Sequence, residues 1–489
     1  MPQLNRTLAS LTATACALAL GACTTVGPNF AAPQGPKGPA AADYAMAGDA
    51  LSPGAALRPE ARAAGPWWQA FGSAELDRVV RQALADNPSV AEAKANLEKA
   101  NAELAATRGA ELPQINANGG VQHEKINLQA FGLKGLAGQP GIGSPTITLY
   151  QIGGGVSYDL DLFGGLKRAT EADQARAERQ LREADAAYLS LSGNVALQAM
   201  RIAGARGQIA AVQEVVAADR RLIDMVRKGQ SLGGESRASL SALVAQLAED
   251  EALLPALQHD LDAARHQLAL LVGKSPAEWT APDFDMASLD GSAVVPVSLP
   301  SDLVRRRPDI LAAEAALHAA TAEIGVAIAD QYPNLRLSAS LTQSTIKPEK
   351  IFNSSASGWD LASGLTAPIF HGGTLRAKRQ VAEAEARAAD ARYRATVLRA
   401  FVQVSDAMAN LASDDQAIAS LRQATKAAEI GVNDVQNGYR LGGASMMDLV
   451  QANRTLSRAH RFLAQAQAQR YMDLVTLYAA TAADWRTAS

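Results

Sequence analysis

Cysteine is nearly absent from this sequence of 489 residues, which holds only Cys16 and Cys23. Cys23 ends an apolar stretch that contains Cys16, so no disulfide framework can form in the chain that follows. Basic and acidic residues are almost balanced, 46 against 49, and this gives no electrostatic footprint for nucleic acid. HExxH, CxxC and phosphate-loop patterns are also missing, so the sequence predicts no metal, no cofactor and no catalytic centre.

The few residues that could suggest such a site are better explained by packing or solvation. His259 and His266 share one helix face and are expected to be solvated or interhelical. The glycines at 153–155 lie in a predicted strand rather than before a helix, which disfavours a nucleotide loop. The arginines at 305–307 are expected to form a solvated helix end before a proline, and the tryptophans at 67–68 to anchor packing.

Beyond its start the chain lacks any apolar run of 18 residues, so no transmembrane helix is expected there. The start itself is short and basic, then apolar, and it closes with Leu20-Gly21-Ala22-Cys23. This pattern is typical of a secretory signal rather than of an apolar first helix. The closing residues resemble a lipobox, which implies acylation of Cys23, and Thr24 after it implies sorting to the outer membrane.

The chain then repeats one plan twice. Pro88 and Pro308 each open a predicted helix, an offset of 220 residues, and the glycine pairs that begin at Gly233 and Gly442 are offset by 209 residues. The expected parts are a signal peptide at 1–22, an extended lipidated segment at 23–65, a first repeat at 66–290 with a hairpin at about 113–163, and a second repeat at 291–489 with a hairpin at about 333–370.

Most of each repeat has a seven-residue apolar period, with alanine on a second seam. Such a period predicts left-handed coiled coils, and alanine lets helices approach closely. The expected helices cover residues 88–111, 168–230, 234–272, 309–331, 374–440 and 445–483. These runs are far longer than the dozen residues usual in globular cores.

The sequence segments between the predicted helices alternate between apolar and polar residues. Residues 115–122, 147–160, 334–342 and, more weakly, 361–369 are therefore predicted strands with one apolar and one wet face. Four strands cannot close a barrel, whereas three chains supply twelve, which is wide enough for a lumen. FGG at 163–165 and FHGG at 370–373 are the points where a strand must swing into a long helix, and Gly164, Gly165, Gly372 and Gly373 permit that turn.

With these residues placed, the chain resembles the outer membrane factor family, the TolC/OprM-like efflux proteins, in its NodT-type lipoprotein branch. The matching text is PWWQAFGSAELDRVVRQALADNPSV at 66–90, YDLDLFGGLKRA at 158–169, LPSDLVRRRPDILAAEA at 299–315, APIFHGGTLRA at 367–377 and GYRLGGASMMDLVQANR at 438–454. The resemblance implies an α+β membrane protein: a homotrimeric channel-tunnel with a 12-stranded outer-membrane barrel and a long α-helical periplasmic tube. It also implies docking to a periplasmic adaptor and an inner-membrane pump of the resistance–nodulation–division type.

The family pattern carries over to the helix tips with two departures. Gly442 is followed six residues later by Asp448, whereas Gly233 is followed by Ser239, and Gln451 stands where a further Asp is common. Tyr439 is accordingly expected to bond Ser239. The resemblance implies a periplasmic gate at Tyr439, Ser239, Asp448, Gln451 and Arg454, and adaptor-docking tips at Gly233, Gly234, Gly442 and Gly443.

The expected function is a passive exit duct for drugs or other small toxic compounds, in a protein that is lipid-anchored in the cell outer membrane. The same fold also serves protein secretion of type I, which the sequence does not separate from efflux. A lipid-anchored coiled-coil scaffold would explain the heptads and Cys23 but not four strands with one apolar face.

Overall fold

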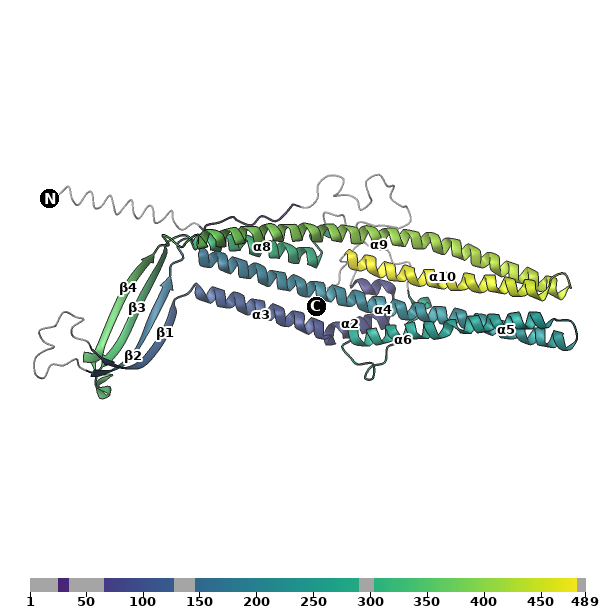
Figure 1. Ribbon diagram of the computed structural model, residues 1–489, viewed down its shortest axis with the longest axis horizontal. Coiled ribbons are helices and arrows are strands. Elements are labelled where there is room, and N and C mark those ends of the chain that lie inside the picture. Colours follow the sequence, from purple (N-terminus) through teal and green to yellow (C-terminus); the bar gives the residue numbers. More distant parts are fainter. Residues whose placement is uncertain (1–24, 35–65, 127–145, 290–302, 482–489) are drawn as a thin grey trace, which may run out of the picture. The chain divides into compact units, whose positions relative to one another are not determined.

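The computed structural model describes residues 25–34, 66–126, 146–289 and 303–481 (Figure 1). The predicted signal peptide and Cys23 lie outside these residues. The chain divides into two compact units, and each of them takes segments from both sequence repeats. Unit 1 comprises Met1–Ala32, Glu98–Glu178 and Glu314–Ala391, and unit 2 comprises Pro33–Leu97, Arg179–Ala313 and Arg392–Ser489.

Unit 1 holds a four-stranded antiparallel sheet in the order β1-β2-β3-β4. Its strands are β1 (Gln114–Lys125), β2 (Thr146–Asp159), β3 (Asn334–Thr345) and β4 (Ser357–Thr366). The prediction of four strands per chain is therefore confirmed. The fourth strand was predicted at 361–369, but it lies at Ser357–Thr366. It ends before Pro368 because proline has no N–H to donate to a sheet.

Long helices continue from the strands. Unit 1 contains parts of α3 (Pro88–Ala110), α4 (Gly165–Ser231), α8 (Pro308–Ala329) and α9 (Thr374–Arg440). α4 begins directly after Gly164, whose φ of 72° is left-handed. In the second copy both Gly372 and Gly373 have positive φ, at 56° and 85°, before α9. These are backbone conformations that glycine adopts without a steric penalty.

Unit 2 contains the remainder of these helices, with α2 (Ala74–Asp86), α5 (Arg237–Glu251), α6 (Leu253–Leu271) and α10 (Met446–Ala480). α4 and α9 are each unbroken over 67 residues. The seven-residue period predicted both as single helices; α9 has the predicted bounds, and α4 begins three residues earlier and ends one residue later than expected. The single helix expected at 234–272 is wrong, since it is interrupted at Ala252. Pro255 explains the break, because proline lacks the N–H that would continue the hydrogen-bond ladder.

The largest core of unit 2 surrounds a short 3₁₀ turn, η2 (Trp67–Phe71). Trp67, Trp68 and Phe71 are fully buried, and the ring of Trp67 stacks on Tyr478 of α10 at 5.4 Å between centroids. Trp68 donates through Nε1 to Asp77 at 2.9 Å. Both indoles are thus packing anchors, as expected.

By length and composition, α8 is the one helix of the described residues that could cross a membrane. Half of its most apolar window is buried within the protein, which is equally the pattern of a core helix.

Candidate functional site: the sheet faces and the helix tips

One face of the sheet is apolar across all four strands. Side chains that pair across strands point to the same side, so the register fixes which residues share a face. Ile115, Val156, Ala339 and Leu361 form one such row, and Ala117, Gly154, Leu341 and Trp359 form the next. Trp359 is 80% exposed and Ile115 is 81% exposed in the single chain. This face is a continuous apolar surface that none of the described residues of the chain covers.

The opposite face is polar. Asn116, Gly155, Ser340 and Asp360 form one row, and Asn118, Gly153, Thr342 and Gly358 form the next. Arg336 and Asp159 join β3 to β2 on this face through paired hydrogen bonds of 2.9 and 3.0 Å. The glycines of β2 serve close strand pairing, since a Cβ on Gly153 would lie 2.6 Å from the carbonyl oxygen of Leu341. The glycines at 153–155 therefore lie inside a strand and do not form a nucleotide-binding loop.

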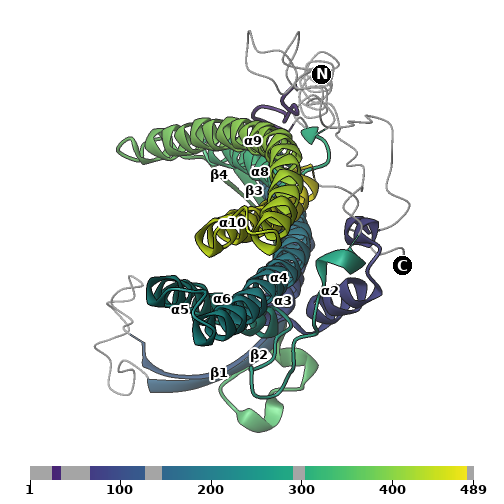
Figure 2. The same ribbon diagram turned by 90° about the vertical axis from the view of Figure 1, so that its right-hand side faces the viewer.

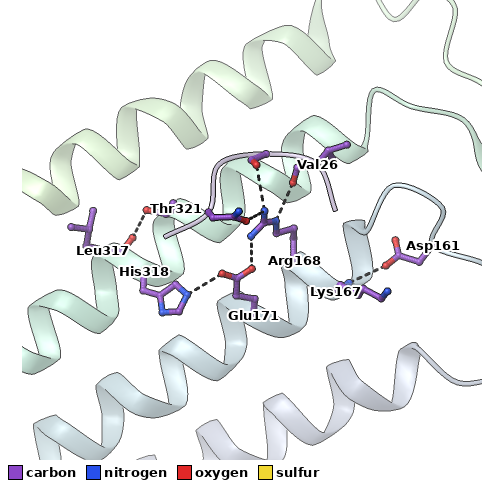
Figure 3. Close-up of polar contacts among 10 residues, drawn as sticks. Val26, Asp161, Lys167, Arg168, Glu171, Leu317, His318 and Thr321 are labelled. Carbon is purple, nitrogen blue, oxygen red and sulfur yellow. Dashed lines mark hydrogen bonds and ion pairs between the residues drawn. The ribbon is translucent and has the colours of Figure 1, made fainter. Parts of the chain in front are cut away.

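A buried arginine fastens the N-terminal segment to unit 1 (Figure 3). Arg168 of α4 is 3% exposed, and it donates to the carbonyl oxygens of Val26 and Gly27 and to the side chain of Asn29. Its remaining donor bonds Glu171, which also contacts His318 of α8 at 3.0 Å. Burial would raise the pKa of Glu171, but the hydrogen bonds with His318 and Arg168 outweigh it and lower that pKa.

Close backbone approach completes this contact. A Cβ on Gly27, whose φ is 92°, would lie 2.5 Å from the Cα of Gly325 in α8. The ring of Phe30 stacks on His318 with centroids 4.3 Å apart. We call residues 25–34 the N-terminal strap. Its residues 26–30 follow the helix surface in one fixed register.

The helix tips of unit 2 share one turn, made twice. The N–H of Gly234 bonds the carbonyl of Gly229, and that of Gly233 bonds Gln230, which is a Schellman motif with a left-handed glycine. Gly442 and Gly443 repeat it at the end of α9. At both tips the preceding leucine is open to solvent, Leu232 by 86% and Leu441 by 87%.

The residues six positions after the tip glycines bond the N-cap residues of the helices that follow. Ser445 is the N-cap of α10, its Oγ accepts from the N–H of Asp448, and the Asp448 carboxylate accepts from the N–H and Oγ of Ser445. This is a capping box. The hydrogen bonds from the Ser445 hydroxyl and N–H lower the pKa of Asp448. In the first copy Ser236 caps α5 and bonds Ser239, without a carboxylate.

Two polar links join the helix tips of the two copies. The hydroxyl of Tyr439, near the end of α9, donates to Glu235 in the turn before α5 at 2.8 Å. The expected partner was Ser239, and that expectation is wrong because Ser239 is engaged in the α5 cap. Arg454 of α10 lies 3.4 Å from Glu249 of α5. Gln451 lies between Asp448 and Arg454 on α10 and is exposed.

An apolar cluster lies between these links. It joins α4 and α5 of the first copy to α10 of the second, with α9 packed beside it. Figures 1 and 2 show the corresponding helices, α4 beside α5 and α9 beside α10. The buried members of this tip cluster are Leu222, Ile223, Val226, Leu243, Met446, Leu449 and Val450.

The histidines at 259 and 266 and the arginines at 305–307 form no ligand site among the described residues. His259 and His266 are exposed, and the described residues contain no group of three or more potential metal ligands. Arg307 differs from the expected solvated helix end, since it is 8% exposed and donates to Asp309, to Gln403 and to the carbonyl of Ala480. Its neighbours Arg305 and Arg306 are exposed.

Known proteins share this architecture. Residues 79–274 and 299–483 match the family model described as "Outer membrane efflux protein". The fusaric acid resistance protein FusA of Burkholderia cepacia is 31% identical, over 79% of this chain and 71% of its own. The pyoverdine export outer membrane protein OpmQ of Pseudomonas putida is 28% identical, over 86% and 89%. The solved outer-membrane channel OprN superposes with a TM-score of 0.84 at 26% identity, over 94% of this chain and 99% of its own.

The agreement extends over both repeats, and the fold is that of an outer-membrane channel subunit. This chain belongs to the outer membrane efflux protein family.

Proposed function

We propose that this protein is the outer-membrane exit duct of a tripartite efflux system, through which small toxic compounds leave the cell passively. The observation that carries this function is the sheet with one apolar and one polar face. Such a sheet suits lipid on one side and a water-filled lumen on the other. A lipid-anchored scaffold in the periplasm would instead leave Trp359, Leu361 and Ile115 exposed to water.

Trimer formation follows from the sheet edges. β1 and β4 have no partner strand on their outer sides within the described chain. In a bilayer every backbone polar group must be bonded, so these edges must pair with other copies. Three copies give twelve strands and an aqueous lumen, whereas two give eight, a barrel that side chains fill.

The helices supply a second surface for the same assembly. α9 carries an exposed stripe with steps of four, three and seven residues, the spacing of a coiled-coil seam. Most of its members are alanine, which lets a neighbouring helix approach closely. The stripe comprises Ala377, Val381, Ala384, Ala391, Ala395, Leu398 and Val402.

Partner docking is proposed at the two helix tips. A Cβ placed on Gly233 or Gly442 would have no neighbour within 4 Å, so both turns are open to a partner. Leu232 and Leu441 present an apolar side chain beside each of them. We assign Gly233, Gly234, Gly442 and Gly443, with these leucines, to the contact with a periplasmic adaptor that is joined to an inner-membrane pump.

The gate is proposed where the tips of the two copies meet. The tip cluster and the Tyr439–Glu235 and Arg454–Glu249 links hold α5 against α9 and α10. Asp448, Gln451 and Arg454 are spaced by three residues and therefore share one side of α10. Asp448 combines a capping role with a negative charge at this mouth, and Ser239 is its neutral counterpart in the first copy.

Deletion of the gene with complementation tests this function. The deletion strain should become more susceptible to a panel of antibiotics and biocides, and the wild-type gene should restore resistance. Gly442→Trp should fail to restore it although trimers persist in the membrane. Gly109→Ala should restore it fully, because a Cβ on Gly109 would have no neighbour within 4 Å. Unchanged susceptibility of the deletion strain to every compound, with defective export of a protein substrate, would favour secretion instead.

Cys23→Ser separates the duct from a scaffold. This variant should lose the acyl mass but stay in the membrane after a high-salt and carbonate wash, because the barrel spans the bilayer independently. Release of the variant into the soluble fraction would contradict the duct.

A further inference from the structure

Two acidic residues occupy buried seam positions where the coiled coil should be apolar. Asp219 of α4 and Asp250 of α5 are each 4% exposed. Asp219 lies between Val216 and Leu222 in the buried stripe of α4, and Asp250 continues the stripe of Leu243 on α5. Burial of two ionised carboxylates side by side is costly unless cations or donors compensate them.

The sequence repeat shows what this seam otherwise contains. At an offset of 209 residues, Asp219 corresponds to Ala428 and Asp250 to Ala459, and both alanines are buried. The second copy therefore packs the same positions with small apolar side chains. The carboxyl groups of the first copy are not required by the helix geometry.

The surroundings of the pair supply too few donors. Asp250 accepts from the side-chain amide of Gln246, but Oδ2 of Asp219 is buried and has no hydrogen-bond partner among the described residues. Oε1 of Gln246 is also buried without a partner. A proton on one carboxyl group would provide the missing donor and remove one of the two charges.

Cations nearby are mostly occupied elsewhere. On α4 the adjacent Arg220 is paired with Glu251 of α5 at 2.7 Å. Arg454 of α10 is shared with Glu249 of α5, and its charge favours the ionised form of Asp219 only as the smallest of the influences on it. At the equivalent level of the second copy, Glu429 of α9 follows Ala428 and lies 3.5 Å from His460 of α10.

We propose that Asp219 and Asp250 form a proton-binding site in the α4–α5 hairpin, which holds one shared proton and loosens the hairpin when that proton is lost. As a consequence of this geometry, burial, the charge of Asp250 and a hydrogen bond between the two carboxyl groups raise the pKa of Asp219 from 3.8 to about 7. The site is distinct from the capping box of Asp448 and from the Tyr439–Glu235 link.

The direction of the pH effect follows from this pKa. A carboxyl group with a raised pKa in the closed hairpin binds its proton there more tightly than in an open one, so opening is favoured as pH rises from about 4 to 7. Above about pH 7 the Asp219 carboxyl group is ionised in the closed and in the open hairpin, so a further rise in pH no longer changes the opening equilibrium. The opening constant should rise on the order of a hundredfold between pH 5 and pH 8, mostly below pH 7.

Hydrogen–deuterium exchange of the full-length trimer in detergent tests the site. Peptides of residues 237–251 should lose protection between pH 5 and pH 8, after correction for intrinsic exchange rates. Asp219→Asn supplies a neutral donor for Asp250, so it should abolish most of this pH dependence and protect the hairpin at least as well as wild type at pH 8. Asp219→Ala is a second variant in case Asp219→Asn disturbs folding. It places in the first copy the residue found at the equivalent position of the second copy, Ala428, and it should also lose the pH dependence.

Asp224→Asn is the matched control, because Asp224 is on the same helix with a side chain that is 69% exposed. This variant should keep the wild-type pH dependence. The proposal is overturned if exchange in wild type is independent of pH, or if Asp219→Asn and Asp219→Ala keep the wild-type pH dependence. It is also overturned if Asp219→Asn protects the hairpin less well than wild type at pH 8, which would show that Asp219 is ionised and paired with Arg454. Exchange reports on the site whether or not the duct exports drugs, so its outcome is independent of the proposed function.

Discussion

The hydrogen bond between Tyr439 and Glu235 predicts how firmly the closed tips are held. Tyr439→Phe removes the hydroxyl and keeps the ring that packs beside the tip cluster. The hydrogen bond with Glu235, helped by burial, raises the pKa of Tyr439, so the hydroxyl remains a donor throughout the physiological range. The variant therefore lacks one link between the copies at any pH near neutrality.

The expected size of the effect can be worked from this contact. A hydrogen bond to a charged group contributes about 1.5–3 kcal/mol, and partial exposure of this pair reduces the contribution to about 1 kcal/mol. That corresponds to roughly a fivefold change in the opening equilibrium of one subunit. If the three subunits of the proposed trimer open together, the contributions add to about 3 kcal/mol, or roughly a hundredfold.

Single-channel recording in planar bilayers measures this change as open probability. Tyr471→Phe is the matched control, because it loses one hydroxyl hydrogen bond of 2.9 Å, to the carbonyl of Leu289, within the other core of unit 2. Glu235→Gln should resemble Tyr439→Phe in direction, and the double variant should add little to the larger single effect. Equal open probabilities in wild type and Tyr439→Phe, or an equal rise in Tyr471→Phe, would refute the reasoning.

Three further outcomes are expected. Arg307→Ala leaves Gln403 and the carbonyl of Ala480 without a charged donor, so it should destabilise unit 2 by about 3 kcal/mol and lower its thermal midpoint, and Arg307→Lys should restore only part of this. Gly27→Ala should release the N-terminal strap to proteases, since its Cβ would lie 2.5 Å from Gly325, whereas Gly109→Ala has nothing within 4 Å and should behave as wild type. Asp448→Asn removes the charge but keeps a side-chain acceptor for the cap, so it should abolish cation preference in bilayers without unfolding α10; retained cation preference would assign Asp448 to the cap alone.

Periodic features of this protein could be predicted from the sequence. A seven-residue spacing over many turns admits only a long coiled-coil helix, and α9 has the bounds that were predicted, Thr374–Arg440. The alternation in β3 likewise identified its apolar face, because a strand's side-chain period is two. These features are local, and each is repeated often enough to outweigh a single contrary residue such as Thr425, whose hydroxyl bonds Leu421 within the helix.

Contacts between distant segments could not be predicted in the same way. Nothing local marks Glu235 as the partner of Tyr439, since 204 positions separate them. Arg307 was misjudged because its partners Gln403 and Ala480 come from two other helices. The capping box could have been predicted from the sequence, because Ser445 followed by Asp448 three residues later is itself a helix-start signal.

The two copies also differ where their seams carry charge, and the difference bears on what each hairpin does. In the second copy Asp414 of α9 has a pKa raised to about 7 by burial and by a hydrogen bond with Asp473 of α10, with Asp415 nearby. The repeat-equivalent positions in the first copy are Ala205 and Ala264, both buried. Among the described residues, each copy therefore has a pair of interacting carboxyl groups at a different level of its hairpin, and alanines stand at the equivalent positions of the other copy. Because Asp219 and Asp250 lie closer in sequence to their tip than Asp414 and Asp473 do to theirs, loss of a proton from the first pair should loosen the proposed gate at a pH at which the tip of the second hairpin keeps its packing.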